Sequence, residues 1–255
     1  MCGRFAASTG PEDIVELFDV RQWDPAETLA PSWNVAPTAP VAAVLERLPK
    51  GGGPPVRQLR VLRWGLVPAW AKSPETAVKM INARADTVHE KPAYRQAFAS
   101  RRCLLPVDGY YEWQAVTGHG QGDPGQGRVR KQPYFVSRVD GAPLALAGLY
   151  EFWRDRRVPA GHPDAWLVTC TIVTTEAEPL LAPVHPRMPL FLQPEAFDDW
   201  LDPALDESEE ARRLLTAPEP GLLELTPVSS AVGNIRNNGP ELTRLVTAEA
   251  EGALF

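Results

Sequence analysis

Residue 2 is a cysteine that directly follows Met1. Methionine aminopeptidases remove Met1 when the second side chain is small, and removal would leave the α-amine of Cys2 beside its thiol. The α-amine titrates near ~7.7 and the thiol near ~8.5, so both nucleophiles are partly available at neutral pH. Such a 1,2-aminothiol condenses with an aldehyde to an imine, and the thiol then closes a five-membered thiazolidine ring. The alternative is that Cys2 is only a small residue at the start of a fold.

Seven motifs follow one another along the chain. They are MCGRF (1–5), SWNVAPT (32–38), RWGLVPAWAK (63–72), NARADT (82–87), RRCLLPVDGYYEW (101–113), APVHPRMP (182–189) and PVSSAVGNIRNNGPEL (227–242). In this order they closely resemble the motifs of the SOS response-associated peptidase family, also called abasic site processing proteins. The resemblance implies a sensor that forms a covalent thiazolidine crosslink to abasic sites in single-stranded DNA, by lyase-type Schiff-base chemistry, during DNA repair.

The resemblance also implies roles for residues at matching positions. Cys2 would be the nucleophile that becomes crosslinked, and Asn82 would hold the N-terminus and the sugar. Glu112 would be the acid/base, and His185 would assist opening of the sugar ring and stabilise the intermediate. The residues implied to bind DNA are Arg4, Arg84 and Arg187, which would contact phosphates, and Trp64 and Trp70, which would shape the DNA-facing surface.

The residue types suit these roles. An abasic deoxyribose is mostly a closed hemiacetal, and an imidazole that titrates near neutrality, such as His185, can protonate its ring oxygen. Imine formation needs proton transfers that a carboxyl such as Glu112 can perform. An asparagine such as Asn82 can orient an amine with its carbonyl and a sugar oxygen with its amide. Arginines can fix the DNA backbone beside the lesion.

Each of these residues also has a purely structural interpretation. Glu112 could be a strand residue facing solvent, His185 could cap a turn, and Asn82 could be a turn or cap residue. Trp64 and Trp70 could be core aromatics. The sequence departs from the usual family pattern at two positions. Asp86 stands where Glu is more usual, and Pro186 stands where Asp is common. Pro186 restricts the preceding residue, His185, to extended conformations.

The remaining cysteines and histidines suggest no further site. Cys103 and Cys170 lie within apolar runs without CxxC spacing, which predicts buried, inert thiols and neither a disulfide framework nor a zinc site. The other histidines form no pattern of metal ligands. We therefore expect no metal and no cofactor.

The charge of the chain is unevenly distributed. The formal net charge is −6, and the run from residue 195 to residue 210 contributes −8 without any Lys or Arg, so the rest of the chain carries +2. Only five of the 26 basic residues are lysine, and arginine suits phosphate because its planar fork donates two hydrogen bonds at once; genome composition is the other explanation. We expect the acidic run to lie away from Cys2.

The pattern of the chain predicts an α+β fold, a single domain over residues 2–246 with a mainly antiparallel sheet or barrel-like core and peripheral helices. Residues 11–20, 194–202 and 208–217 are predicted to be helical, and the strand-like runs are 41–48, 56–67, 102–113, 133–139, 144–153, 166–175 and 188–192. Residues 247–255 are expected to fray. No secretory signal or membrane span is expected, so we predict that the protein lies in the bacterial cytoplasm. We expect it to associate with the nucleoid when bound to DNA. We also predict a monomer.

Two other functions remain open. The first is an autocatalytic or cysteine-type peptidase (a hydrolase), as the family name implies, although no local signature of a cysteine protease is present. The second is a non-catalytic module that reads single strands or modified bases with the same arginines and tryptophans. Incubation with an abasic oligonucleotide would separate these functions from crosslinking.

Overall fold

The computed structural model describes residues 2–49, 51–117, 129–159, 161–205 and 209–246. The expected frayed tail at 247–255 and most of the Gly-rich loop at 117–132 lie outside these residues. Within them, no helix is long and apolar enough to cross a membrane.

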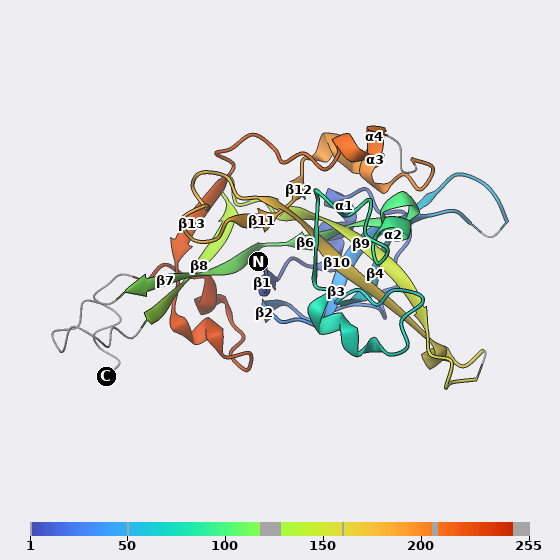
Figure 1. Cartoon of the computed structure of the whole chain (residues 1–255), viewed down its shortest axis with the longest axis horizontal. Helices are drawn as coiled ribbons and strands as arrows, with labels where there is room; N and C mark the ends of the chain where they lie inside the picture. Colours follow the sequence, from blue (N-terminus) through green and yellow to red (C-terminus); the bar gives the residue numbers. More distant parts are fainter. Residues whose placement is uncertain (1, 50, 118–128, 160, 206–208, 247–255) are drawn as a thin grey trace.

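A five-stranded antiparallel sheet carries the N-terminal strand in its interior (Figure 1). Its strands are β1 (Phe5–Ala7), β2 (Ser32–Val35), β7 (Gly109–Thr117), β8 (Val129–Arg138) and β13 (Leu223–Pro227), in the order β13-β8-β7-β1-β2. Phe5 pairs with Tyr110, and the Tyr111 amide donates to the Arg4 carbonyl at 2.9 Å. Because the pairing is antiparallel, it directs the residues before Arg4 toward Glu112.

A larger sheet closes into a barrel-like ring. Its strands are β3 (Pro40–Arg47), β4 (Val56–Trp64), β5 (Asn82–Arg84), β6 (Arg102–Val107), β9 (Leu144–Arg154), β10 (Trp166–Glu176), β11 (Arg187–Pro189) and β12 (Phe191–Leu192). The order β10-β4-β3-β6-β9 becomes a ring because β9 also pairs with β10. The pairings of β10 with β4 and with β5 are parallel, and the others are antiparallel. The expected mainly antiparallel, barrel-like α+β fold is confirmed.

Strands β6 and β9 are buried on both faces, which explains their continuous apolar sequences. In β6, Cys103 and Leu105 point into one hydrophobic cluster, which also contains Cys2, Phe5 and Tyr110. Leu104, between them, points into a second cluster on the other face. We call these the inner and outer clusters.

Short helices cover the outer cluster on one side of the barrel (Figure 1). The α-helices are α1 (Pro11–Leu17), α2 (Arg95–Ser100), α3 (Phe197–Leu201) and α4 (Glu209–Arg213). The 3-10 helices are η1 (Pro74–Lys79), η2 (Pro163–Ala165), η3 (Pro194–Ala196), η4 (Ser230–Gly233) and η5 (Pro240–Thr243). The helices predicted at 11–20, 194–202 and 208–217 are therefore present but shorter than expected.

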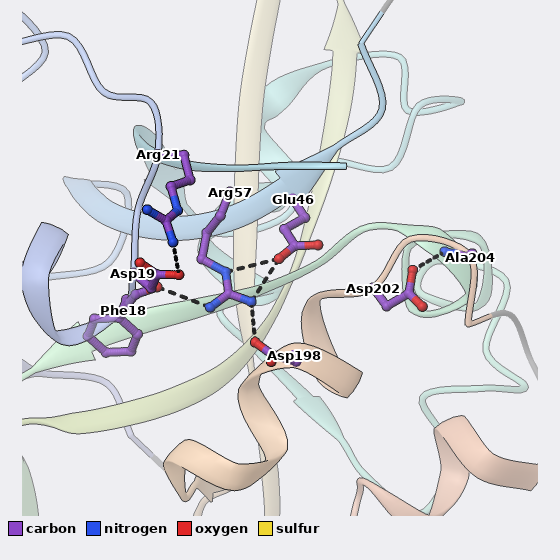
Figure 2. Close-up of polar contacts among 8 residues, drawn as sticks. All are labelled: Phe18, Asp19, Arg21, Glu46, Arg57, Asp198, Asp202 and Ala204. Carbon is purple, nitrogen blue, oxygen red and sulfur yellow. Dashed lines mark hydrogen bonds and ion pairs between the residues drawn. The ribbon is translucent and has the colours of Figure 1, made fainter. Parts of the chain in front are cut away.

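The described part of the acidic run is attached to the barrel through Arg57 (Figure 2). The Arg57 guanidinium donates to Glu46 Oε1 at 2.8 Å, to Asp198 Oδ1 at 2.5 Å and to the Phe18 carbonyl at 3.1 Å. Phe197 and Trp200 of the run pack in the outer cluster, whereas Cys2 belongs to the inner one. This placement agrees with the expectation that the acidic run lies away from Cys2.

The run at 102–113, predicted as one strand-like segment, is two strands in different sheets. The chain leaves β6 at Asp108, whose carboxylate accepts hydrogen bonds from the Ser8 amide at 2.7 Å and the Thr9 hydroxyl at 2.9 Å. A Cβ at Gly109 would clash with the Val136 carbonyl and the Phe135 ring, so only glycine allows β8 to approach this closely. This break transfers Tyr110 and Glu112 to the sheet that contains β1.

Candidate functional site

Cys2 and Asn82 are in direct contact. The Asn82 side-chain amide donates a hydrogen bond of 2.8 Å to the Cys2 carbonyl. Asn82 opens β5, and its pairing with Ile172 of β10 fixes its position. The Asn82 Oδ1 atom is sealed from solvent and has no hydrogen-bond partner in the described part of the chain. Asn82 therefore fixes the main chain of Cys2 with its amide and keeps a carbonyl free to accept from an amine.

The Cys2 thiol is fully buried. Burial raises its pKa well above the ordinary value, and the nearby Glu112 carboxylate raises the pKa further. The Sγ atom lies 3.9 Å from the Arg4 carbonyl, to which it donates. At neutral pH this cysteine is therefore a neutral thiol and not a preformed thiolate.

Glu112 and His185 line one small cleft where the two sheets meet. The cleft has a volume of about 10 Å³, room for about one water molecule. Its lining residues are Tyr110, Glu112, Val136, Leu181, Val184, His185, Arg187 and Leu225. Glu112 is only 7% exposed, so the interpretation as a strand residue facing solvent is wrong.

His185 is held in a tight turn around Pro186. The Arg187 amide donates to the His185 Nδ1 atom at 3.0 Å. In the tautomer in which Nδ1 accepts this bond, Nε2 carries the ring proton. His185 can therefore both stabilise the turn and take part in chemistry. Its Nδ1 atom accepts the hydrogen bond of the turn, and its Nε2 atom can contact a ligand.

The three arginines expected to contact phosphates differ in their exposure and in their hydrogen-bond partners. Arg84 is exposed and paired with Asp86, with Nε to Oδ1 at 3.0 Å. Arg187 is half-buried and donates to the carbonyl and hydroxyl of Thr174, each at 2.6 Å. Burial lowers the pKa of Arg187, and repulsion from Arg84 lowers the pKa further, so the two cations lie close together. Their contact with phosphate remains a prediction.

Arg4 makes structural contacts instead of lying open at the surface. Its Nη1 atom donates to Asn34 Oδ1 at 2.7 Å and to the Val232 carbonyl at 3.0 Å. Asn34 is buried and donates in turn to three carbonyls of the segment 232–237. Sequence reasoning gave Asn34 no role, although it lies in the SWNVAPT motif, and its contacts show that this motif anchors residues 232–237 beside β1.

The two tryptophans have opposite environments. Trp64 is fully buried, packs against Phe5 with ring centroids 4.8 Å apart, and donates to the Ile81 carbonyl at 3.0 Å. Its expected place on the DNA-facing surface is therefore wrong, because the ring has no accessible surface. Trp70 is 68% exposed, and its role in binding DNA remains a prediction.

A larger pocket lies away from the four proposed catalytic residues. It has a volume of about 370 Å³ and lies between α1 and strands β1 to β4. None of Cys2, Asn82, Glu112 and His185 lines it. Among the described residues, no group of three or more His, Cys, Asp or Glu side chains gathers as metal ligands would.

A sequence model of the family described as SOS response associated peptidase (SRAP) matches residues 1–235. The chain belongs to the SRAP family. It is 38% identical over 242 residues to the abasic site processing protein YoqW of Bacillus subtilis, covering 95% of this chain and 98% of that protein. It is 30% identical over 275 residues to the abasic site processing protein HMCES of Gallus gallus, covering 94% of this chain and 76% of that protein.

Solved structures of similar fold support the SRAP architecture. A protein from Bacteroides thetaiotaomicron superposes with a TM-score of 0.74 at 24% identity, covering 96% of this chain and 100% of that one. A phage-related protein from Bordetella bronchiseptica has a TM-score of 0.64 at 30% identity, covering 89% of this chain and 94% of that one. The fold of this SRAP chain is thus shared with both proteins over most of its length.

Proposed function

We propose that this chain processes abasic sites in single-stranded DNA by forming a thiazolidine crosslink through Cys2 after removal of Met1. The observation that carries the proposal is the hydrogen bond from Asn82 to the Cys2 carbonyl, beside a cleft lined by Glu112 and His185. Glu112 lies near the Cys2 thiol and lines the same cleft as His185, which supports a shared role for these residues and Asn82. Relatives named abasic site processing proteins support the same activity.

The first step is attack by the α-amine. The amine nitrogen adds to C1′ of the open aldehyde, and the aldehyde oxygen takes up a proton to give a carbinolamine. Loss of one water then gives the imine. The unpartnered Oδ1 atom of Asn82 lies on the side chain that holds the Cys2 carbonyl, so it can accept a hydrogen bond from this amine and aim its lone pair.

The second step is ring closure by the thiol. The Sγ atom bonds to C1′ of the imine, and the thiol proton ends on the nitrogen, so the overall reaction releases one water and changes no oxidation state. A neutral thiol suits this order, because the raised pKa of Cys2 keeps the thiol from competing with the amine for the aldehyde.

Glu112 and His185 supply the proton transfers. Glu112 is close enough to Cys2 for its charge to raise the pKa of the thiol, so it can receive the thiol proton and pass it to the nitrogen. His185, across the cleft, protonates the ring oxygen of the closed sugar when the ring opens. Arg84 and Arg187 hold phosphates beside the lesion, and Trp70 offers an exposed stacking face.

A cysteine peptidase is less well supported by the same site. Peptidases of this type attack with a thiolate, which requires a lowered thiol pKa, whereas burial raises the pKa of Cys2. A non-catalytic DNA-binding module would not need a buried carboxylate beside the first residues of the chain.

Intact-mass spectrometry after incubation with an abasic single-stranded oligonucleotide tests the proposal. We expect an adduct whose mass is that of the protein without Met1 plus the oligonucleotide minus one water. Cys2→Ala should give no heat-stable adduct, and a protein that retains an N-terminal extension should be equally inactive. The matched control is Cys170→Ala, which removes an equally buried thiol inside the barrel and should crosslink normally. Reversible binding without an adduct, or cleavage of added peptides, would refute the crosslinking function.

A further inference from the structure

Tyr110 is a buried titratable residue to which the mechanism above gives no task. It is 2% exposed and belongs to the same hydrophobic cluster as Cys2. Successive side chains of a strand point to opposite faces, so Tyr110 and Glu112, two residues apart in β7, point to the same side. Both line the cleft that His185 and Arg187 close from the other side.

The Tyr110 hydroxyl differs from most other tyrosine hydroxyls of the protein. Tyr94, Tyr111 and Tyr134 donate to Asn82, Trp33 and Gln114, respectively, at 2.8 to 3.3 Å. The Tyr110 hydroxyl makes no hydrogen bond with any described residue, and yet it is not among the polar atoms sealed from solvent. Buried tyrosines usually find a hydrogen-bond partner. The Tyr110 hydroxyl is therefore a donor without a described partner, on a residue that lines the cleft.

The surroundings of Tyr110 keep it protonated. Burial raises its pKa well above the ordinary value, and the nearby acidic groups Cys2, Glu112 and Glu178 raise the pKa further. The phenol therefore stays neutral at any pH at which the reaction would run. The neutral phenol of Tyr110 therefore keeps a hydroxyl proton that it can donate in a hydrogen bond at this cleft.

We propose that Tyr110 is a further catalytic residue whose hydroxyl donates a hydrogen bond to the oxygen on C1′ of the abasic sugar. This is the aldehyde oxygen that becomes the carbinolamine hydroxyl when the amine adds. No proton is transferred to or from Tyr110, which polarises the C=O bond and stabilises the negative charge that develops on the oxygen. The assignment rests on the proposed crosslinking function for its chemistry.

The test compares two oligonucleotides that cannot crosslink because neither has an aldehyde. A borohydride-reduced abasic site carries a hydroxyl on C1′, whereas a tetrahydrofuran site has no oxygen there beyond the ring oxygen. We expect the unmodified protein to bind the reduced site about fivefold more tightly, the effect of one net hydrogen bond. In Tyr110→Phe this preference should disappear, and affinity for an undamaged strand should not change.

Tyr150→Phe is the matched control. Tyr150 is a buried tyrosine of the same cluster, its hydroxyl makes no hydrogen bond with a described residue, and it does not line the cleft. It should keep the preference for the reduced site. Removing the Tyr110 hydroxyl breaks no described contact, so Tyr110→Phe should fold, and unchanged binding of the undamaged strand checks this directly.

Crosslinking of a natural abasic site adds a kinetic measurement. Tyr110→Phe should form the adduct about 100-fold more slowly, because removing one donor from a developing oxyanion lowers rates by about 100- to 1,000-fold. A Tyr110→Phe protein that still preferred the reduced site, or an unmodified protein without that preference, would overturn the role of Tyr110. Absence of any adduct in the unmodified protein would instead refute the crosslinking function, and the binding comparison would still be interpretable.

Discussion

The side-chain amide of Asn82 donates a hydrogen bond of 2.8 Å to the main-chain carbonyl of Cys2, 80 residues earlier in the chain. This contact orients the second residue of the protein from a strand, β5, whose own position is set by parallel pairing with β10. A chain terminus would otherwise be free to move. The bond therefore holds Cys2 in a fixed position near Glu112, where the proposed function needs its amine and thiol.

Asn82→Ala should slow crosslinking about 100-fold while affinity for an undamaged single strand stays within twofold. The variant loses both the bond that fixes Cys2 and the acceptor proposed for its amine, and misplacement of a reacting group by about 1 Å can cost this much. Single-turnover kinetics on abasic oligonucleotides measure the effect. Asn82→Asp should be similarly slow, because a carboxylate cannot donate to the Cys2 carbonyl. A variant that lost DNA affinity and kept its rate would show that Asn82 binds DNA only.

Glu112→Gln should slow crosslinking about 100-fold or more, because the amide cannot transfer protons. Removing the carboxylate charge should also lower the pKa of the Cys2 thiol, although burial keeps that pKa raised. Alkylation rates of Cys2 across pH measure the thiol, and adduct formation measures the reaction. A variant with the lower thiol pKa and faster crosslinking would show that Glu112 only repels the thiolate. Reversal of the adduct should slow as well.

His185→Ala should slow the reaction of a closed abasic sugar by about 100-fold. A substrate whose aldehyde is already open should recover most of this loss, because its ring needs no protonation. His185→Asn is the control for structure: its side-chain oxygen can still accept from the Arg187 amide, but the residue cannot titrate. It should be as slow as His185→Ala. Equal defects on closed and open substrates would remove ring opening from the role of His185.

Arg84→Ala should weaken binding to all single-stranded sequences alike and flatten the slope of log K against log salt by about 0.7. Arg157→Ala is a suitable control, because Arg157 is exposed and paired with an aspartate two residues away, as Arg84 is. It should leave the slope unchanged if its face does not bind DNA. If Arg84→Ala left the slope of log K against log salt unchanged, Arg84 would not contact phosphate.

Arg4→Ala should act mainly on folding, unlike Arg84→Ala. It removes two hydrogen bonds from a charged donor and leaves the buried Asn34 oxygen unpaired, which should lower the free energy of unfolding by about 2–3 kcal/mol. Urea unfolding measures the change. Arg4→Lys should restore only part of the loss, because both bonds come from the Nη1 atom and the lysine ammonium does not reproduce its position. Unchanged stability together with weaker DNA binding would show instead that Arg4 contacts phosphate.

The stability of the protein should fall as the pH rises above about 8.5. Burial raises the pKa of Cys170 in the folded state, whereas the thiol of an unfolded chain ionises near ~8.5. Above that pH the folded state holds the proton that the unfolded state has lost, so the free energy of unfolding decreases with pH. Cys170→Ala should flatten this decrease by about 1.4 kcal/mol per pH unit. Val136→Ala, at a buried residue of the same cluster that does not titrate, should leave the slope unchanged.

Local signals in the sequence determined much of this protein. The acidic first turn and apolar spacing of residues 11–20 predicted α1, and the continuous apolar runs at 144–153 and 166–175 predicted β9 and β10. These signals work because a helix face or a strand buried on both sides is encoded by neighbouring residues. The short strand β5 has no such signal, since three residues carry no periodicity, and only its pairing with β10 makes it a strand.

The site shows the same division between local and long-range information. Cys2, Asn82, Glu112 and His185 could be named from motifs, because a motif carries residue types and order. Only the tertiary structure decided that Trp64 is buried, that Arg4 is bonded to Asn34, and that the Cys2 thiol is neutral. It also decided that Tyr110 lines the cleft beside Glu112 and His185. Burial, the pKa of a thiol and the partner of a hydroxyl depend on which distant segments pack around a group, and residue types along the chain do not specify that packing.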